Sequence, residues 1–314
     1  MIEQMNIVFM GTPEFAVPCL DALVKNGEKV SAVFTQPDKP KGRGMKLLPT
    51  PVKEAALGYG IPVYQPQSLK KGEDAEKALE ELKQIDPDLI VVVAYGKLLP
   101  VSILELPKYF CINVHASLLP RYRGAAPIQR VILNGEKKTG VTTMLMAEGL
   151  DTGDMLLSAE TQIGENETAA ELTKRLSEMG ADLLIDTVKN IDSITPVPQD
   201  DSESNYAAMI TKDLCPIDFS MSAREIHNRI RGLSDSPCAK AVYRGKMLKI
   251  YASEMTGEKT SASPGTIVNE KNFTVACGDG NTVTFTQIQA EGGKRMKTAD
   301  YLRGKPAERG EILS

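Results

Sequence analysis

Two polar side chains at the end of an apolar segment have the types and the spacing for acyl chemistry. Asn113 and His115 are separated by one residue, and both precede a short segment limited by Pro120. Alternate residues of an extended chain point to the same side, so the amide and the imidazole are presented together. An amide can donate a hydrogen bond to a developing oxyanion, and a histidine can transfer a proton near neutral pH. The pair therefore suits the transfer of an acyl group to a nucleophile.

A carboxylate that could assist this pair is Asp151. It lies in a loop framed by Gly149 and Gly153, between two predicted strands. A loop of this kind can place a carboxylate against the end of a neighbouring strand. An isolated Asn-x-His pair more often belongs to an ordinary core or surface. The strand end, the Pro-limited turn and the glycine-framed loop together favour catalysis, and we predict Asn113, His115 and Asp151 as the catalytic residues.

The first part of the chain alternates short apolar segments with amphipathic ones. This rhythm predicts an α/β fold with a Rossmann-like, doubly wound and mostly parallel sheet. Ligands of such sheets bind beyond the carboxyl ends of the strands, and residues 113–120 follow one of those ends. Thr168 and Glu171 have the spacing of a capping box, which predicts a long helix that reaches about Asn190. Strands are predicted at 6–10, 29–35, 61–64, 89–94, 111–114, 140–146 and 155–163, with further helices at 14–26, 75–84 and 127–134.

A change of pattern near residue 192 predicts a second domain. Pro196, Pro198 and a mixture of Ser, Asp and Glu are typical of a linker. One helix at 222–232 and several short strands with turn signals follow, and they predict a small OB-like β-barrel. We therefore expect a catalytic domain at 1–191, a linker at 192–206 and a C-terminal β-barrel at 207–314. The barrel strands are predicted at 239–243, 247–251, 265–268, 273–276 and 283–288.

Composition and short motifs argue against several classes of protein. The longest apolar run, 89–94, is far shorter than the ~20 residues of a membrane span, and the first residues lack the basic region of a secretory signal. The five cysteines are scattered without a Cys-x-x-Cys pair, which favours a cytoplasmic protein with reduced thiols and no metal. Residues 11–14 lack the Gly-x-Gly-x-x-Gly spacing of a dinucleotide site. Since no heptad run or other assembly device is present, we expect a monomer.

Charge is unevenly distributed along the chain. From Met209 onward there are 16 Lys and Arg against 12 Asp and Glu, whereas the preceding residues have 21 against 29. A basic second part suggests a polyanionic partner, although an excess of four charges over about a hundred residues is modest. The residues of the barrel that we expect to contact such a partner are Lys240, Arg244, Lys246, Lys249, Lys294, Arg295 and Lys297.

A basic segment at 37–53 interrupts the otherwise acidic first part. Its prolines and glycines predict that it forms no regular element. The segment is either a solvated basic loop or an arm that binds RNA, and its acidic surroundings favour the arm. RNA recognition usually targets unstacked ends, and Arg43 can pair bidentately with phosphates or base edges. The segment contains Lys39, Lys41, Arg43, Lys46 and Lys53 against one acid, Asp38.

The second histidine of the chain, His227, lies in a predicted helix rich in charge. Arg224, Arg229 and Arg231 surround it in sequence. We expect this helix face to be solvated, with the three arginines as alternative ligands of phosphates.

The residues around the predicted catalytic trio also carry a family resemblance. The pattern Asn113-x-His115-x-Ser117-Leu118-Leu119-Pro120, followed by Arg123-Gly124, Pro127 and Asp151-x-Gly153-Asp154, is similar to the signature of the 10-formyltetrahydrofolate-dependent formyltransferases. Segments 9–16, 35–44 and 92–96 resemble the members of that superfamily that act on aminoacylated tRNA. The resemblance covers essentially the whole chain.

The resemblance implies transfer of a formyl group from 10-formyltetrahydrofolate to the free amino group of methionyl-initiator tRNA, for translation initiation and without a metal. Asn113, His115 and Asp151 match the family's catalytic trio, and 93–96 resemble a wall of the pterin pocket. The basic segment would grip the acceptor end of the tRNA, and the barrel would contact its backbone. The folate-binding turn is matched by Ser117, Leu118, Leu119 and Pro120, and the tRNA contacts are expected from Lys39, Lys41, Arg43 and Lys46.

Three other functions remain open on these residues. A formyltransferase of an amino-sugar nucleotide would share the trio but would not need the basic segment. A formyltetrahydrofolate hydrolase would use water in place of the amine. A binding module for RNA or folate would not need the three catalytic residues together. Binding of a polyanion further predicts that activity falls as salt rises.

Overall fold

The computed structural model describes residues 4–41 and 46–314. Contacts within the chain divide it into two compact units, of which the first comprises Met1–Gly124, Gly140–Thr161 and Lys174–Tyr206. The second comprises Ala125–Thr139, Gln162–Thr173 and Ala207–Ser314. Two short segments from the first part of the sequence therefore fold with the C-terminal residues.

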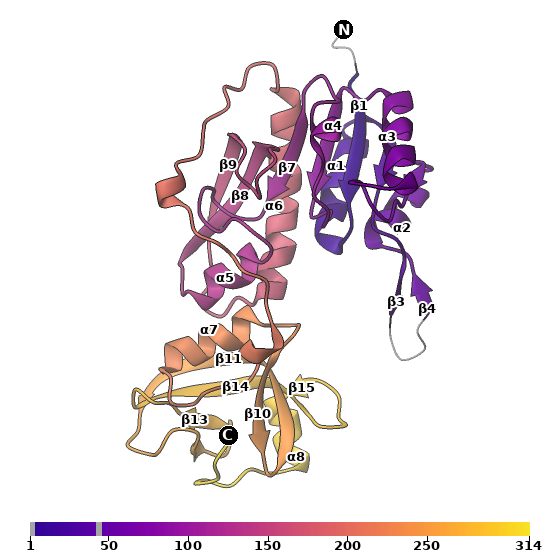
Figure 1. The fold of residues 1–314 in the computed structure, drawn as a ribbon. Coiled ribbons are helices and arrows are strands. Elements are labelled where there is room, and N and C mark those ends of the chain that lie inside the picture. The colour runs from indigo at the N-terminus through magenta and orange to yellow at the C-terminus, as the bar shows by residue number, and fades with distance from the viewer. Residues whose placement is uncertain (1–3, 42–45) are drawn as a thin grey trace. The chain divides into compact units, whose positions relative to one another are not determined.

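The first unit is built on a seven-stranded sheet with the order β5-β2-β1-β6-β7-β8-β9 (Figure 1). The strands from β5 to β7 pair in parallel, and β7 pairs with β8 in the antiparallel sense. The predicted fold class of a doubly wound, mostly parallel sheet with a separate antiparallel domain is confirmed. The strands are β1 (Asn6–Gly11), β2 (Lys29–Phe34), β5 (Val63–Tyr64), β6 (Leu89–Val93), β7 (Cys111–His115), β8 (Lys138–Leu145) and β9 (Met155–Gln162).

Helices cover both faces of this sheet, so its central strands are apolar on both sides. In β1, Ile7 and Phe9 pack into one core with α1 (Val17–Lys25), α2 (Pro51–Gly58) and α6 (Ala169–Lys189). The alternate residues Val8 and Met10 pack into a second core with α3 (Glu73–Ile85) and α4 (Val101–Leu104). As predicted, α6 begins with a capping box, in which the Thr168 backbone N–H donates to Glu171 and the Glu171 N–H donates to the Thr168 hydroxyl.

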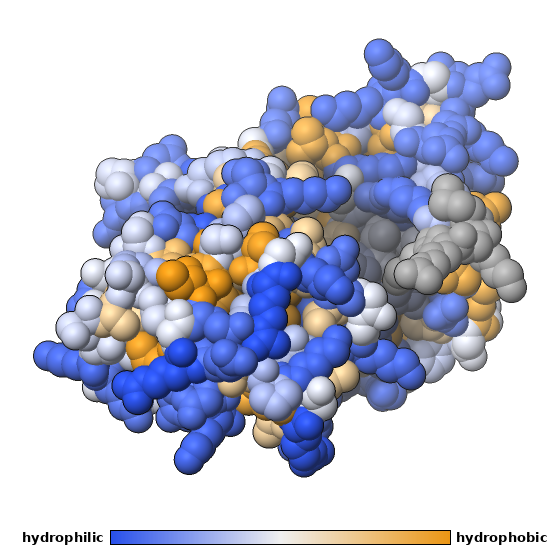
Figure 2. Space-filling model, turned by 90° about the horizontal axis from the view of Figure 1, so that it is seen from below, coloured by the Kyte–Doolittle hydropathy of each residue, from blue (hydrophilic) through white to orange (hydrophobic). Residues whose placement is uncertain are grey.

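The second unit contains an antiparallel sheet with the order β10-β11-β14-β13-β12, and β15 pairs with β14. Two of its strands are longer than predicted, and the C-terminal helix α8 was not predicted. The face of the molecule drawn in Figure 2 is mainly hydrophilic. The elements are α5 (Pro127–Leu133), α7 (Ala223–Gly232), β10 (Ala239–Tyr243), β11 (Lys246–Lys259), β12 (Ile267–Asn269), β13 (Thr274–Ala276), β14 (Asn281–Ala290), β15 (Met296–Lys297) and α8 (Thr298–Gly304).

The prediction that residues 37–53 form no regular element is wrong. Strands β3 (Lys39–Lys41) and β4 (Lys46–Leu48) pair as an antiparallel ribbon, which projects from the first unit in Figure 1. Helix α2 begins at Pro51, and the hydroxyl of its N-cap, Thr50, accepts the N–H of Lys53 at 3.1 Å. A two-stranded ribbon tolerates proline because both strands are edges, and proline is favoured in the first turn of a helix.

Candidate active site

Asn113 and His115 lie on β7, near the middle of the sheet. Asn113 pairs with Val92 of β6 and with Met144 of β8, and both site side chains are more than nine-tenths buried. The Nε2–H of His115 donates to the carbonyl oxygen of Tyr122 at 2.9 Å. A carbonyl can only accept, so this nitrogen must carry the proton, and Nδ1 is the nitrogen left for chemistry.

Asp151 approaches His115 from the loop between β8 and β9. Its Oδ2 lies 3.7 Å from Nδ1 of His115 and accepts the backbone N–H of Gly124 at 2.8 Å. The backbone of Asp151 is left-handed, with φ of 53°. Gly153 is required next to it, since a Cβ there would stand 1.8 Å from the carbonyl oxygen of Leu145. The structure thus brings the Asp151 carboxylate close to His115 on the strand that also carries Asn113, with a gap between imidazole and carboxylate.

The turn after β7 is held by buried hydroxyls. The Ser117 hydroxyl donates to the carbonyl oxygen of Arg121 at 2.7 Å, and the Thr142 hydroxyl donates to the carbonyl oxygen of Ser117 at 2.7 Å. Thr142 also accepts the N–H of Leu119 at 3.2 Å. Ser117 and Leu119 are buried, whereas Leu118 and Pro120 are half-buried. Ser117 therefore shapes the turn with its side chain, and the backbone and Pro120 form its outer surface.

A second turn at the same edge follows β6. Ala94 and Gly96 are exposed with positive φ, and Tyr95 between them is buried. The carbonyl oxygen of Tyr95 accepts the Thr12 hydroxyl and the Gln36 side-chain amide, both at 3.0 Å. Thr12, Gln36 and Tyr95, which belong to segments far apart in sequence, thus meet beyond the carboxyl ends of β1, β2 and β6.

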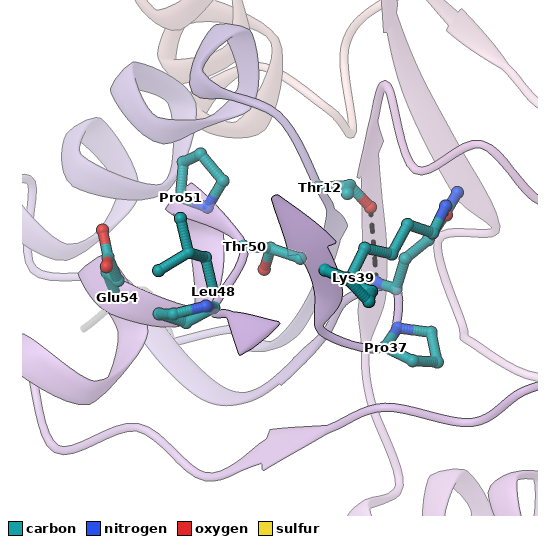
Figure 3. A pocket seen from close by; sticks show the side chains of 10 residues that line it. Thr12, Pro37, Lys39, Leu48, Thr50, Pro51 and Glu54 are labelled. Carbon is teal, nitrogen blue, oxygen red and sulfur yellow. Dashed lines mark hydrogen bonds between the residues drawn. The ribbon is translucent and has the colours of Figure 1, made fainter. Parts of the chain in front are cut away.

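A cavity of about 330 Å³ lies at the base of the β3–β4 ribbon (Figure 3). Lys39, which lines it, is exposed, and its ammonium donates to Gln36 Oε1 at 2.8 Å. None of the three predicted catalytic residues lines the cavity. It is lined by Thr12, Gln36, Pro37, Lys39, Pro40, Leu48, Pro49, Thr50, Pro51 and Glu54.

One cation of the basic segment, Lys53, is engaged in contacts within the first unit. The ammonium of Lys53 donates to Asp38 and to Gln65, each at 2.7 Å. Hydrogen bonds from Lys53 and from Gln65 hold the pKa of Asp38 below its usual range. Lys53 is therefore part of a local network at the start of α2. Arg43 lies outside the described residues, as do the side chains of Lys41 and Lys46.

The expectation of a solvated His227 is wrong, because its side chain is fully buried. Its Nε2–H donates to the carbonyl oxygen of Glu165, and the Ser253 hydroxyl donates to Nδ1, both at 2.9 Å. Burial lowers the pKa of His227, because the charged ring would lose its hydration. Arg231 is also buried and donates to Asn228 and to backbone carbonyls, so it is unavailable to phosphates. In the sequence, Ile226 and Ile230 predict one buried face of α7, and the charged residues around them gave no sign that His227 and Arg231 are buried as well.

Four basic residues of the second unit share one face of its sheet. Lys240 and Lys249 stand directly opposite each other on β10 and β11, between residues whose side chains point into the core. Arg295 stacks on the Tyr251 ring at 4.4 Å and donates to Gln287, which pairs with Lys297. We call Lys240, Lys249, Arg295 and Lys297 the basic sheet face. Like charges directly opposite destabilise a sheet, which favours a functional role for this pair.

Arg244, another predicted contact, is committed elsewhere. Its guanidinium donates to both carboxylate oxygens of Glu311, at 2.6 and 2.9 Å. This bidentate pair lowers the pKa of Glu311 to about 2.

Sequence reasoning did not identify Gln199 and Asn205 around the Asp151 loop, and it named Arg123 only as part of the family pattern. The side chain of Gln199 bonds to the loop and to Arg123, and Asn205 accepts the N–H of Tyr122. The polar character of Gln199 and Asn205 inside a linker was the available signal. Across residues 4–41 and 46–314, no cluster of three or more His, Cys, Asp or Glu side chains could hold a metal ion, and no helix is long and apolar enough to cross a membrane.

Two family descriptions match most of the chain. "Formyl transferase" matches residues 5–188, and "Formyl transferase, C-terminal domain" matches residues 209–306. The methionyl-tRNA formyltransferase of Clostridium novyi is 53% identical over 313 residues, which are 98% of this chain and all of that protein. The methionyl-tRNA formyltransferase of Alkaliphilus oremlandii is 52% identical over 312 residues, covering 98% and 99% of the two chains.

Solved structures of lower identity share the fold. An N-formyltransferase from Helicobacter canadensis, in complex with folinic acid and dTDP-3-aminofucose, superposes with a TM-score of 0.67 at 24% identity and covers 90% of this chain and 98% of its own. HypX from Aquifex aeolicus, in complex with tetrahydrofolic acid, gives 0.66 at 15% identity and covers 99% of this chain and 51% of its own.

Proposed function

The chain belongs to the formyl transferase family, and from this premise we propose that it transfers the formyl group of 10-formyltetrahydrofolate to the amino group of methionyl-initiator tRNA. The name shared by relatives of about 50% identity over the full length supports this acceptor. The observation that carries the chemistry is the approach of Asp151 to His115 beside Asn113, at the carboxyl end of β7.

The free amine of the methionyl ester attacks the formyl carbon, and a carbon–nitrogen bond forms as negative charge develops on the formyl oxygen. Asn113 donates a hydrogen bond to this oxygen, an effect typically worth roughly 3–4 kcal/mol. Nε2 of His115 is occupied by the Tyr122 carbonyl, so a proton on Nδ1 supplies the second donor. Asp151 stabilises the imidazolium and, directly or through water, accepts the proton released by the amine. Collapse breaks the bond to N10 of tetrahydrofolate, and N10 takes up a proton.

The formyl donor is proposed to lie against Ser117–Pro120 and the turn at 94–96. The 94–96 turn follows β6, the neighbour of β7, so both turns lie at one edge of the sheet. Ala94 and Gly96 are exposed, and the Thr12 and Gln36 side chains fix the turn by donating to the carbonyl oxygen of Tyr95. A rigid backbone surface of this kind can present carbonyl and amide groups to a pterin ring.

The tRNA is proposed to contact Lys39, Lys41, Arg43 and Lys46 with its acceptor end, and the basic sheet face with its backbone. We assign residues 1–191 to catalysis and 207–314 to tRNA binding. Phosphate contacts release counterions, so the apparent affinity for tRNA should fall as salt rises. A salt-independent KM for tRNA would remove this part of the proposal.

One assay separates the candidate functions. The protein is incubated with 10-formyltetrahydrofolate and, in parallel, with methionyl-initiator tRNA, an amino-sugar nucleotide, or no acceptor. We expect formylmethionyl-tRNA only. Product from the amino sugar, or release of formate without an acceptor, would replace the proposed function. His115→Ala and Asp151→Asn should each lower turnover severely, to a small residual rate, while tRNA binding is retained.

A further inference from the structure

The predicted linker, residues 192–206, folds as part of the first unit and passes close to Asp151. Val197 forms an antiparallel bridge with Met155, at the start of the edge strand β9, with hydrogen bonds of 2.8 and 2.9 Å. Residues 195–198 and 200 are exposed, and Gln199 among them is half-buried. The segment thus pairs with β9 at a single bridge, and Gln199 directs its side chain to the Asp151 loop.

The side-chain amide of Gln199 makes three hydrogen bonds around the Asp151 loop. Its Nε2 donates to the carbonyl oxygens of Asp151 at 2.9 Å and Gly153 at 2.7 Å, and its Oε1 accepts Nε–H of Arg123 at 2.9 Å. Two carbonyls require a donor and a guanidinium requires an acceptor, so the orientation of the amide is determined. Arg123 is itself anchored by Asp201 at 2.8 Å.

The Asp151 loop needs such support. Residues 147–150 are exposed, and Asp151 has the left-handed backbone that residues other than glycine rarely adopt. The Asp151 carboxylate is fixed by the N–H of Gly124, the residue that follows Arg123. Two consecutive residues therefore support Asp151. Arg123 binds Gln199, which holds the backbone of Asp151, and Gly124 binds the Asp151 carboxylate.

We propose that Gln199 is a positioning residue for formyl transfer, and that the linker is in this way part of the active centre. Gln199 contacts no reacting atom. It holds the backbone of Asp151 so that the carboxylate stays 3.7 Å from Nδ1 of His115. The inference rests on the proposed function, because it takes Asp151 to be the group that handles charge on the imidazole during transfer.

The test replaces the amide with an apolar side chain of similar length, Gln199→Met. The matched control is Glu203→Gln, a change at an exposed position of the same linker. We expect kcat of Gln199→Met to fall by about 10–100-fold, since misplacement by about 1 Å can cost 10²-fold. KM for 10-formyltetrahydrofolate should stay at the wild-type value, and the midpoint of thermal unfolding should fall by only a few degrees, because the lost hydrogen bonds also support the loop. The control should retain wild-type kcat.

A double-mutant cycle decides whether Gln199 acts through Asp151. In the Asp151→Asn background, Gln199→Met should have little further effect on the residual rate. The chain has only two histidines, so the ring signals of His115 are readily assigned by NMR, and they should move in Gln199→Met and not in the control.

Wild-type kcat in Gln199→Met, additive losses in the double mutant, or unmoved His115 signals would each overturn the proposal. If wild-type protein fails to formylate methionyl-tRNA, the proposed function fails instead, and the NMR comparison still tests the positioning by Gln199.

Discussion

Replacing Gly153 by alanine tests whether the catalytic geometry depends on the backbone of the Asp151 loop. The added Cβ would stand 1.8 Å from the carbonyl oxygen of Leu145 and 2.8 Å from its carbonyl carbon, whereas real Cβ atoms essentially never come within 3.0 Å of a heavy atom. The φ of Gly153 lies outside the left-handed region, so steric contact alone opposes the substitution. The loop and the end of β8 must therefore separate by about 1.2 Å, the difference between these two distances.

This separation would displace Asp151, two residues away, from its position 3.7 Å from His115. A misplacement of about 1 Å can cost 10²-fold in rate, so we expect kcat of Gly153→Ala to fall about 100-fold. The hydrogen bond from Leu145 N–H to the Asp154 carbonyl at 2.9 Å would also be lost. That loss should lower the free energy of unfolding by about 1 kcal/mol, so the protein stays folded.

Single-turnover formylation measures the effect on the chemical step. The control is Gly58→Ala, because a Cβ at this helical position would meet nothing within 4 Å. We expect the control to retain full activity. Wild-type turnover in Gly153→Ala, with the fold intact, would refute the view that the position of Asp151 limits the reaction.

Three further predictions concern the second unit. Because burial lowers the folded-state pKa of His227 below its unfolded value of about 6.5, the unfolded chain binds more protons as the pH falls. The free energy of unfolding should therefore fall as the pH is lowered from 7.5 to the folded-state pKa, by at most ~1.4 kcal/mol per pH unit. Urea denaturation at several pH values measures this free energy, and its dependence on pH should be smaller in His227→Gln. Exchanging Lys240 and Lys249 for glutamine should raise KM for tRNA and lower the slope of log KM against log salt concentration by up to about two. An unchanged slope would exclude the basic sheet face as a contact of the tRNA. Ser222→Ala removes the cap that binds the N–H of Glu225, and calorimetry should show a loss of about 1 kcal/mol, with an unchanged midpoint counting against the cap.

The elements that depend on local pattern were predictable from the sequence. The continuous apolar run at 89–94 could only be a strand buried on both faces, and the spacing of Thr168 and Glu171 placed the start of α6 within one residue. Asn113 and His115 sit two residues apart on one strand, so their common orientation follows from the repeat of the extended chain.

The basic segment and His227 were described wrongly for a physical reason. Proline is excluded from the interior of helices and sheets because it has no backbone N–H to donate. A two-stranded ribbon has only edge strands, so it can contain proline. Whether a cation is free depends on what folds beside it, and Lys53 meets Asp38 and Gln65 only through the packing of α2. His227 lies in a charged sequence, yet Glu165 and Ser253 complete its hydrogen bonds from segments that are distant in the chain.

The sequence by itself determined the chemistry, because residue types and short spacings carry it: an amide and an imidazole on one strand, and a carboxylate in a glycine-framed loop. Tertiary structure alone decided the distance between His115 and Asp151, which are 36 positions apart, and the position of Gln199, a further 48 positions along the chain. These contacts arise where the loop between β8 and β9 approaches β7 and where the linker binds that loop. No local pattern encodes them, because they depend on how the sheet and the linker pack.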